Sequence, residues 1–176
     1  MKLVLKPTGV VTVEFPHLVR LMDGNQFDTI YHEHFCYYSF LTVERIFASH
    51  GMAIFDVERL RTHGGSLRIF ACHQGAREPL PSVAAMRRLE QAYGIEDLAT
   101  YRSFAARVEE TKAKLLTFLI GAKRDGKRVA GYGAPGKGNT LLNYCGIKAD
   151  LLPYTVDRNP YKHGKFTPGT HIPNYA

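Results

Sequence analysis

Residues 128–157 read RVAGYGAPGKGNTLLNYCGIKADLLPYTVD, and this stretch decides how the last third of the chain folds. A short apolar run at 128–133 leads into glycines, which predicts a strand that ends in a tight loop. A helix is predicted over 139–145, with Gly146 as its stop, and a second strand over 152–157. Strand, glycine loop, helix and strand in this order form a βαβ unit, for which a right-handed crossover is expected.

The glycine loop matches two phosphate-binding patterns. The GxGxxG pattern, followed about 20 residues later by an acidic residue as in dinucleotide-binding folds, is formed by Gly131, Gly133, Gly136 and Asp157. The GxxxxGK pattern of a P-loop is also present, but Gly138 stands where a serine or threonine would hold magnesium, so NTP hydrolysis is not expected. Lys137 would add a point charge for a phosphate. The alternative is a glycine turn that only closes strand against helix.

The distribution of charge also favours an anionic ligand for this region. The 176 residues carry a formal net charge of +7. Residues 127–176 hold seven Lys/Arg against two Asp/Glu, a balance of +5. Phosphate is the usual partner of such a region, and a solvated basic surface is the alternative. The chain has no basic run of five residues and no zinc-finger pattern, so nucleic acid is not expected as a partner.

The composition predicts a folded cytoplasmic protein. With 45% apolar and 22% charged residues the chain can bury a core. No apolar run approaches the length of a membrane span, and Lys6 and Pro7 interrupt the apolar start, so neither a membrane partner nor export is expected. Cys36, Cys72 and Cys145 stand far apart without a CxxC pair, which predicts reduced thiols and no metal.

The rest of the chain predicts a small sheet followed by helices. A buried strand is predicted over 10–15, ended by Pro16, and an antiparallel pair over 52–60 and 66–72 around a turn at 62–65. Between them a helix is predicted with Thr42 as N-cap and Gly51 as its stop. Two further helices are predicted over 82–93 and 97–123; the apolar face of the second is formed by Phe104, Val108, Leu115 and Leu119.

Four polar and titratable side chains stand in a row at Tyr31-His32-Glu33-His34. A histidine beside a carboxylate is typical of proton transfer. In a regular strand Tyr31 and Glu33 would face one way and both histidines the other, so a shared site requires a loop or two distinct roles. Two alternatives stay open: His32 and His34 as metal ligands, and a set of satisfied polar side chains under a loop.

The turn between the antiparallel strands supplies two further candidates. Ligands of open parallel sheets lie beyond the carboxyl ends of the strands. If the strands ending at Phe15 and Leu60 run parallel in one sheet, the segments that follow them reach the same edge. His63 and Ser66 are therefore candidate substrate contacts, with a plain hairpin turn as the alternative.

Three segments together resemble the sugar C-methyltransferase family. They are FDTIYHEHFCYYSFLTVERIFASHGMAIFDVERLRTHGGSLRIF (27–70), GYGAPGKGNTLLNYCGI (131–147) and VDRNPYKHGKFTPGTHIP (156–173). The resemblance implies an S-adenosylmethionine-dependent enzyme that methylates a carbon of a nucleotide-linked keto-deoxysugar. Members are much longer, with a zinc-binding domain, a Rossmann-type methyltransferase domain and a second Rossmann-like domain. This chain is expected to be a fragment that lacks the N-terminal zinc region and most of the S-adenosylmethionine site.

The resemblance implies the following α/β architecture and site. Residues 1–76 form the C-terminal part of the methyltransferase sheet, 77–126 a helical linker, and 127–176 a truncated Rossmann-like domain that binds a nucleotide-diphosphate sugar. By the same resemblance the catalytic residues are Tyr31, Glu33 and His34, with His34 as the base. Implied contacts to the nucleotide sugar come from Tyr132, Gly133, Ala134, Lys137, Gly138 and Asn139.

Two other functions stay open at this point. One is an NAD(P)-dependent oxidoreductase that uses Gly131–Gly136 and Asp157. The other is a non-catalytic nucleotide-binding module, because the isolated chain is expected to be inactive without the rest of its cofactor site.

Overall fold

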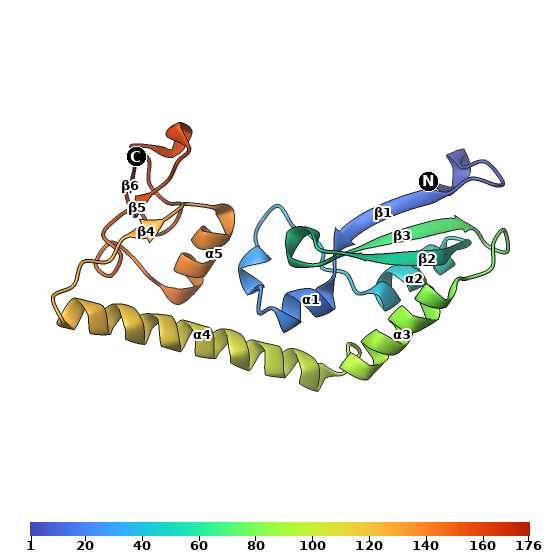
Figure 1. Ribbon diagram of the computed structural model, residues 1–176, viewed down its shortest axis with the longest axis horizontal. Helices are drawn as coiled ribbons and strands as arrows, with labels where there is room; N and C mark the ends of the chain where they lie inside the picture. Colours follow the sequence, from blue (N-terminus) through green and yellow to red (C-terminus); the bar gives the residue numbers. More distant parts are fainter. The chain divides into compact units, whose positions relative to one another are not determined.

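The computed structural model describes all residues 1–176 and shows a mixed α/β protein (Figure 1). The chain forms two compact units. The N-terminal unit contains Met1–Gln26 and Phe35–Phe104, and the C-terminal unit contains Phe27–His34 and Ala105–Ala176. The short segment Phe27–His34, which carries the Tyr-His-Glu-His row, therefore belongs to the unit built mainly from the end of the chain.

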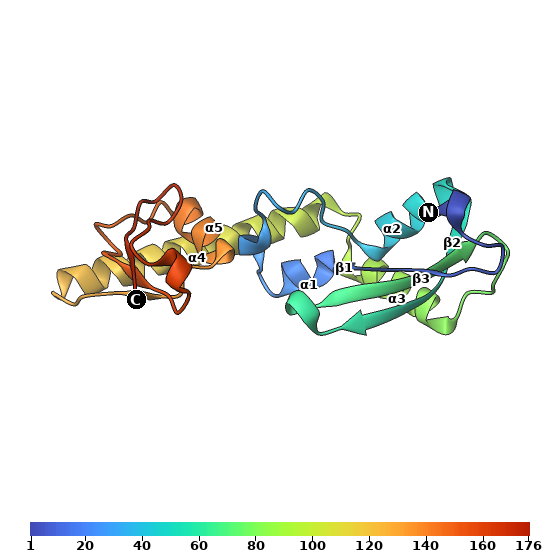
Figure 2. The same cartoon turned by 90° about the horizontal axis from the view of Figure 1, so that it is seen from above.

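The N-terminal unit is built around a three-stranded sheet. Its order is β1-β3-β2, and β3 is antiparallel to both neighbours, so β1 and β2 run in the same direction (Figure 2). The predicted pairing of the last two strands is confirmed. The elements in chain order are η1 (Lys2–Val4), β1 (Val11–Pro16), α1 (Leu18–Asp23), α2 (Phe40–Ser49), β2 (Met52–Leu60), η3 (Thr62–Gly64), β3 (Ser66–His73) and α3 (Pro81–Tyr93).

One face of this sheet carries the core. Helices α2 and α3 both pack on it, as Figure 1 shows. The buried apolar side chains come from the sheet and from both helices, and include Phe15, Phe40, Leu67, Ile69 and Val83. The expectation that the first strand is buried holds for one face only. Phe15 of β1 is fully buried and Val11 and Val13 pack partly buried on the core, whereas the residues that alternate with them face solvent because the helices cover one side of the sheet.

A fully buried carboxylate joins three elements of this unit. Glu90 of α3 has 0% exposure and accepts hydrogen bonds at Oε1 from His17 Nε2 (2.8 Å) and Phe40 N (2.6 Å). Its Oε2 accepts from Leu41 N at 2.9 Å. The cap of α2 differs from the prediction: Ser39, not Thr42, is the N-cap, and its Oγ accepts from Thr42 N at 3.1 Å.

The C-terminal unit contains a small parallel sheet with the order β4-β5-β6 (Figure 1). The predicted βαβ unit is confirmed, but β6 was not predicted because its two residues lie in a turn-rich segment. The elements are η2 (Phe27–Thr29), the C-terminal part of α4 (Leu98–Arg124), β4 (Gly131–Tyr132), α5 (Gly136–Cys145), β5 (Thr155–Val156), η4 (Pro160–Lys162) and β6 (Asn174–Tyr175).

Helix α5 begins three residues earlier than predicted, at Gly136. It ends as predicted, since Gly146 caps it in the left-handed conformation (φ 72°). Its buried face packs with α4 and the loops of the sheet in a core formed by Leu119, Cys145, Ile147, Leu152 and Ile172. None of the helices combines the length and the hydrophobicity that a membrane crossing requires.

Candidate active and nucleotide-binding site

The Tyr-His-Glu-His row folds as a tight turn rather than a strand. The amide of His34 donates to the carbonyl of Tyr31 at 2.9 Å, which closes the turn over His32 and Glu33. As a result the Tyr31 and His34 rings lie next to each other, with centroids 4.6 Å apart and planes inclined by 33°. Both are half-buried, whereas His32 and Glu33 are exposed. The turn thus brings together two side chains that a strand would have placed on opposite faces.

A backbone contact sets the tautomer of His34. Its Nδ1 lies 2.9 Å from the carbonyl oxygen of Thr29. A carbonyl oxygen can only accept, so Nδ1 carries the proton in this contact. In the neutral imidazole the basic lone pair is then on Nε2, and the ring is oriented by the same hydrogen bond. Within residues 1–176, no group of three His, Cys, Asp or Glu side chains is placed to hold a metal ion.

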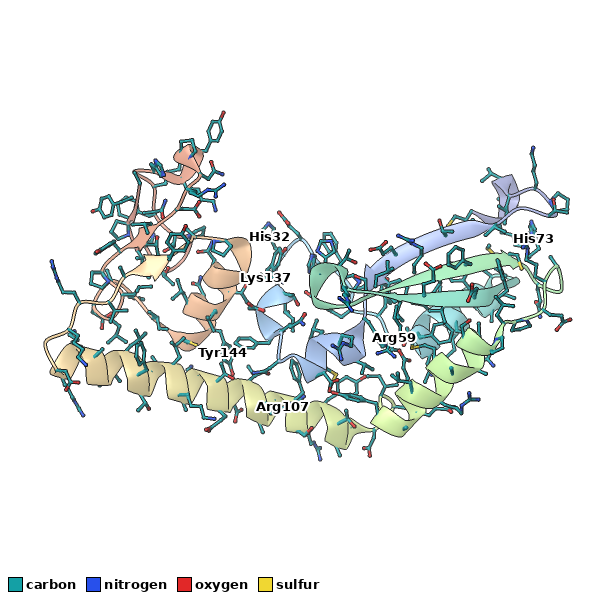
Figure 3. The ribbon with its side chains drawn as sticks, in the orientation of Figure 1. His32, Arg59, His73, Arg107, Lys137 and Tyr144 are labelled. Carbon is teal, nitrogen blue, oxygen red and sulfur yellow. The ribbon has the colours of Figure 1, made fainter.

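The turn belongs to the same unit as the glycine loop. Phe27 of η2, immediately before the turn, packs edge-on against Tyr144 of α5, with ring centroids 5.2 Å apart. The ammonium of Lys112 on α4 lies 5.3 Å from the centroid of the same Tyr144 ring. Figure 3 labels His32 in the turn, and Lys137 and Tyr144 near the two ends of α5. Segments about 100 positions apart in the sequence are thus packed around one helix.

The glycine loop connects β4 to the N-terminus of α5. A Cβ on Gly131 would lie 2.9 Å from Cγ2 of Thr155, so only glycine allows the close approach of β4 and β5. Gly133 adopts a left-handed backbone (φ 89°), and its amide donates to Val156 O at 2.6 Å. A Cβ on Gly136 would meet nothing within 4 Å. The space next to the backbone of Gly136 is therefore empty, as the approach of a phosphate to the start of α5 requires.

The first turn of α5 presents donors and one unsatisfied acceptor. Helical geometry leaves the amides of Gly136, Lys137 and Gly138 without acceptors inside the helix, and Pro135 supplies no side-chain cap. The exposed Lys137 adds a positive charge beside them. Asn139 Oδ1 is buried and accepts no hydrogen bond. The amides and the lysine suit a phosphate, and the asparagine oxygen suits a hydroxyl or N–H of the same ligand. Tyr132, before the loop, is 85% exposed.

Asp157 and Lys162 fix the conformation of this loop. Asp157 Oδ2 accepts from the Ala134 amide (2.7 Å) and from Lys162 Nζ (2.8 Å), and its Oδ1 accepts from Asn159 N (2.8 Å). Lys162 Nζ also donates to the Ala134 carbonyl at 2.9 Å. The N–H and the carbonyl of Ala134 thus both form hydrogen bonds within the protein. Sequence reasoning missed Lys162, although its position five residues after Asp157 placed it on the same loop.

The hydrogen bond from Lys162, and those from two backbone amides, hold the pKa of Asp157 well below its usual range. A carboxylate whose pKa is lowered by folding stabilises the folded state above its ordinary pKa of about 4. That contribution is lost as the pH falls below this value toward the folded pKa. We therefore expect Asp157→Asn to unfold more easily at pH 7 and to show a weaker loss of stability on acidification below about pH 4.

Denaturant unfolding at pH 7 and at pH 3 measures this effect. Asp150→Asn is the matched control, because Asp150 is exposed and its side chain forms no ion pair. Identical pH dependence of unfolding for wild type and Asp157→Asn would show that the clamp on Ala134 does not depend on the Asp157 charge.

His63 and Ser66 lie in the N-terminal unit, where η3 connects β2 to β3. Ser66 is buried, and its Oγ donates to Thr62 O at 3.1 Å. The amide of His17, which follows β1, donates to Gly65 O at 3.0 Å. The ends of β1 and β2 therefore meet at one edge of the sheet. Residues 31–34 belong to the C-terminal unit, so the expected meeting of that segment with His63 and Ser66 stays a prediction.

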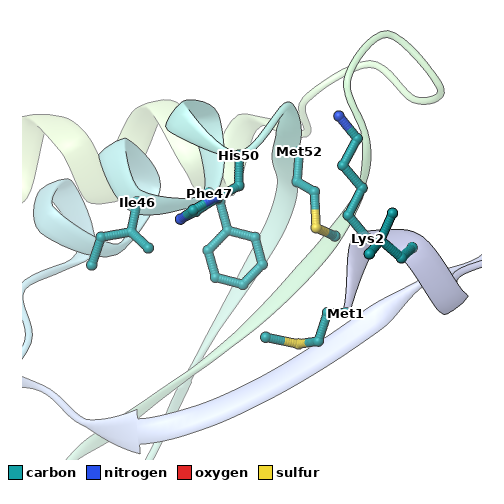
Figure 4. A pocket seen from close by; sticks show the side chains of 7 residues that line it. Met1, Lys2, Ile46, Phe47, His50 and Met52 are labelled. Atoms are coloured by element: carbon teal, nitrogen blue, oxygen red, sulfur yellow. The ribbon is translucent and has the colours of Figure 1, made fainter.

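A largely apolar hollow of about 430 Å³ lies elsewhere in the N-terminal unit, between η1 and α2 (Figure 4). Met1, Ile46, Phe47 and Met52 line it together with the polar side chains of Lys2 and His50. None of the predicted site residues is among the residues that line it.

Comparison with known proteins gives two matches. Residues 61–176 match a family model described as C-methyltransferase C-terminal domain. The protein C-methyltransferase NovU of Streptomyces niveus is 44% identical over 173 residues, which cover 98% of this chain and 41% of that protein. The chain thus spans about two fifths of the length of the curated relative it matches.

Proposed function

The chain belongs to the C-methyltransferase family, and on that premise we propose that the full-length protein transfers a methyl group from S-adenosylmethionine to a carbon of a nucleotide-linked keto-deoxysugar. One observation supports this proposal most. The His34 turn and the glycine loop, distant in sequence, are parts of one compact unit. A base and an anion-binding loop in one unit are what proton removal from a diphosphate-linked sugar requires.

In this proposal His34 is the general base. Its Nε2 takes a proton from the carbon next to the keto group, and the electron pair of that C–H bond moves to the carbonyl as an enolate. The hydrogen bond from Nδ1 to Thr29 O holds the ring in place and stabilises the charge that it acquires. The Tyr31 hydroxyl donates to the enolate oxygen, and Glu33, on the exposed side of the turn, adds negative charge near the imidazolium.

The glycine loop does not fit S-adenosylmethionine, which supplies an electrophilic methyl group when bound. The cofactor has a cationic sulfonium and no phosphate. The glycine loop, by contrast, offers helix amides and the positive charge of Lys137. Lys162, which is bonded to Asp157, adds a second positive charge next to the loop. A site of this kind binds anions. We therefore assign no residue of this chain to the cofactor.

The glycine loop is assigned to the diphosphate of the nucleotide sugar. Three helix amides and Lys137 supply hydrogen-bond donors and positive charge, and the balance of +5 in residues 127–176 adds a favourable field. The NAD(P)-dependent oxidoreductase alternative requires Asp157 to accept from a ribose hydroxyl. Three of the acceptor positions of Asp157 are already used within the protein, and this loop lies in the region that matches the C-methyltransferase model, so we do not propose that function.

Incubation of the full-length protein with labelled S-adenosylmethionine and a nucleotide-linked keto-deoxysugar tests the proposal. The expected product is the C-methylated nucleotide sugar, identified by mass and by loss of the carbon-bound proton. Tight binding of NAD without any methyl transfer would refute the proposal. Residues 1–176 alone are expected to bind the nucleotide sugar without methylating it.

Lys137→Ala is expected to weaken nucleotide-sugar binding about tenfold and to leave kcat within about twofold, because a phosphate contact far from the reacting carbon contributes equally to ground and transition states. The measurement is KM and kcat for the sugar at saturating methyl donor. Lys148→Ala is the control, since Lys148 is equally exposed but follows the opposite end of α5. A fall in kcat with KM unchanged would contradict the assigned role of Lys137.

A further inference from the structure

A polar hollow of about 410 Å³ lies at the edge of the sheet in the N-terminal unit. Its lining includes the side chains of three arginines together with the turn that leads into β3, namely Arg20, Arg59, Arg61, Gly65 and Ser66. We call it the arginine pocket; Arg59 is labelled in Figure 3. A volume of this size is in the range of small-ligand sites.

The arginine pocket carries positive charge that the chain does not neutralise. Arg59 and Arg61 are exposed and form no ion pair, and Arg20 reaches Asp23 only at 3.6 Å. A neighbouring arginine shows the contrast. Arg68 lies 3.1 Å from Glu14 and 3.5 Å from Glu58, so its charge is compensated on both sides.

Arg59 lies near the end of β2. It pairs with Leu67 in the β2–β3 ladder, and its side chain is exposed whereas Leu67 is fully buried. A charged side chain on an edge strand also discourages pairing with a foreign strand. That effect needs neither Arg20 nor Arg61 nearby, so it does not explain why all three gather around one hollow.

Two glycines form the turn that lines the pocket. Gly64 and Gly65 have φ values of +81° and +126°. Glycine adopts such conformations without a steric penalty. A Cβ on Gly65 would lie 2.9 Å from Cβ and Cγ of Arg20. Glycine therefore allows the stem of Arg20 to lie directly on the turn.

We propose that the arginine pocket is a second anion site, which binds a phosphate or diphosphate group. Guanidinium groups bind phosphate oxygens in pairs through a planar fork of donors. The pocket has three guanidinium groups, and only one of them lies near a carboxylate. This balance of charge matches a ligand that carries two or more negative charges. This site is separate from the glycine loop and does not depend on methyl transfer. Its phosphate comes either from a free phosphate compound or from the nucleotide sugar, and in the second case the glycine loop does not hold the diphosphate of the sugar.

Calorimetric titration of the full-length Lys137→Ala protein with inorganic pyrophosphate at low ionic strength tests the pocket, because this background weakens the glycine-loop site. Adding Arg59→Gln and Arg61→Gln is expected to weaken pyrophosphate binding at least about tenfold. The control adds Arg88→Gln and Arg102→Gln to the Lys137→Ala protein instead, because both are exposed arginines of the same unit. It is expected to bind pyrophosphate as tightly as the Lys137→Ala protein itself. Equal pyrophosphate affinity in the two sets of variants would overturn the proposal.

Competition identifies the source of the phosphate. If the nucleotide sugar displaces pyrophosphate from the Lys137→Ala protein, the pocket holds the substrate's own diphosphate. If both bind together, the ligand is a separate phosphate compound. Either result supports the pocket, and failure to detect methyl transfer would leave it intact while refuting the proposed function. Equal melting temperatures of the variants exclude loss of fold.

Discussion

Replacing His34 by asparagine is expected to lower kcat for methyl transfer by about 10²–10⁴-fold, the usual contribution of a positioned general base. Asparagine is close to histidine in size and its amide can still donate to Thr29 O, so the turn should keep its shape. What the substitution removes is the basic lone pair on Nε2. KM for the nucleotide sugar should change little, because the diphosphate is assigned to the glycine loop.

Deuterium exchange separates proton removal from the later steps. In D₂O without the methyl donor, wild type is expected to exchange the carbon-bound proton next to the keto group, and His34→Asn is not. His32→Asn is the matched control. His32 is on the same turn but is exposed, with its ring centroid 6.2 Å from that of Tyr31, and should exchange normally. Normal exchange in the His34 variant would assign the base to another residue.

Much of the fold could be predicted from local patterns. Turn glycines and alternating strands predicted the β2–β3 pair, and the glycine loop predicted the βαβ unit. The prediction failed where tertiary context decides. Residues 10–15 read as a buried strand, but only one face of β1 packs on the core, and Thr12 and Glu14 on the other face are exposed. Ser39 rather than Thr42 caps α2, since the chain could have entered the helix at either hydroxyl residue.

The site was predictable in composition but not in geometry. The residue types at 31–34 indicate proton transfer, yet only the turn shows that the Tyr31 and His34 rings lie next to each other. The packing of Phe27 on Tyr144 has no local signal, because it joins positions that are distant in the sequence. Asp157 illustrates the limit of motif reading. Its spacing suggested a ribose contact, whereas its actual partners are Ala134, Asn159 and Lys162.

Glu90→Ala is expected to lower the free energy of unfolding of the N-terminal unit by about 3–5 kcal/mol, because it leaves three buried donors without an acceptor, each at a cost of about 1–3 kcal/mol. Phe40 and Leu41 are the first two residues of α2, and their amides have no acceptor within the helix. The Glu90 carboxylate accepts from both and also places negative charge at the helix N-terminus, where it is favourable. His17 is 2% exposed and loses its partner as well.

Glu90→Gln removes the negative charge and one hydrogen-bond acceptor but keeps the volume of the side chain. The side chain keeps its size, but its NH₂ must face either Leu41 N–H or the pair formed by Phe40 N–H and His17. A donor then faces a donor in a site without solvent, so we expect a loss of about 2–4 kcal/mol even without a cavity. Since a domain is typically stable by only about 5–15 kcal/mol, both variants should melt at markedly lower temperature.

Glu96→Gln is the control for removing a carboxylate. Glu96 pairs with Arg45 at the surface, where both side chains are more than half exposed, and such pairs contribute about 0–1 kcal/mol. In denaturant unfolding at pH 7 we therefore expect a large loss of stability in both Glu90 variants and almost none in Glu96→Gln. If Glu90→Gln were as stable as wild type, the amides of α2 would not depend on this carboxylate, and the packing of α2 on α3 would have to rest on apolar contacts alone.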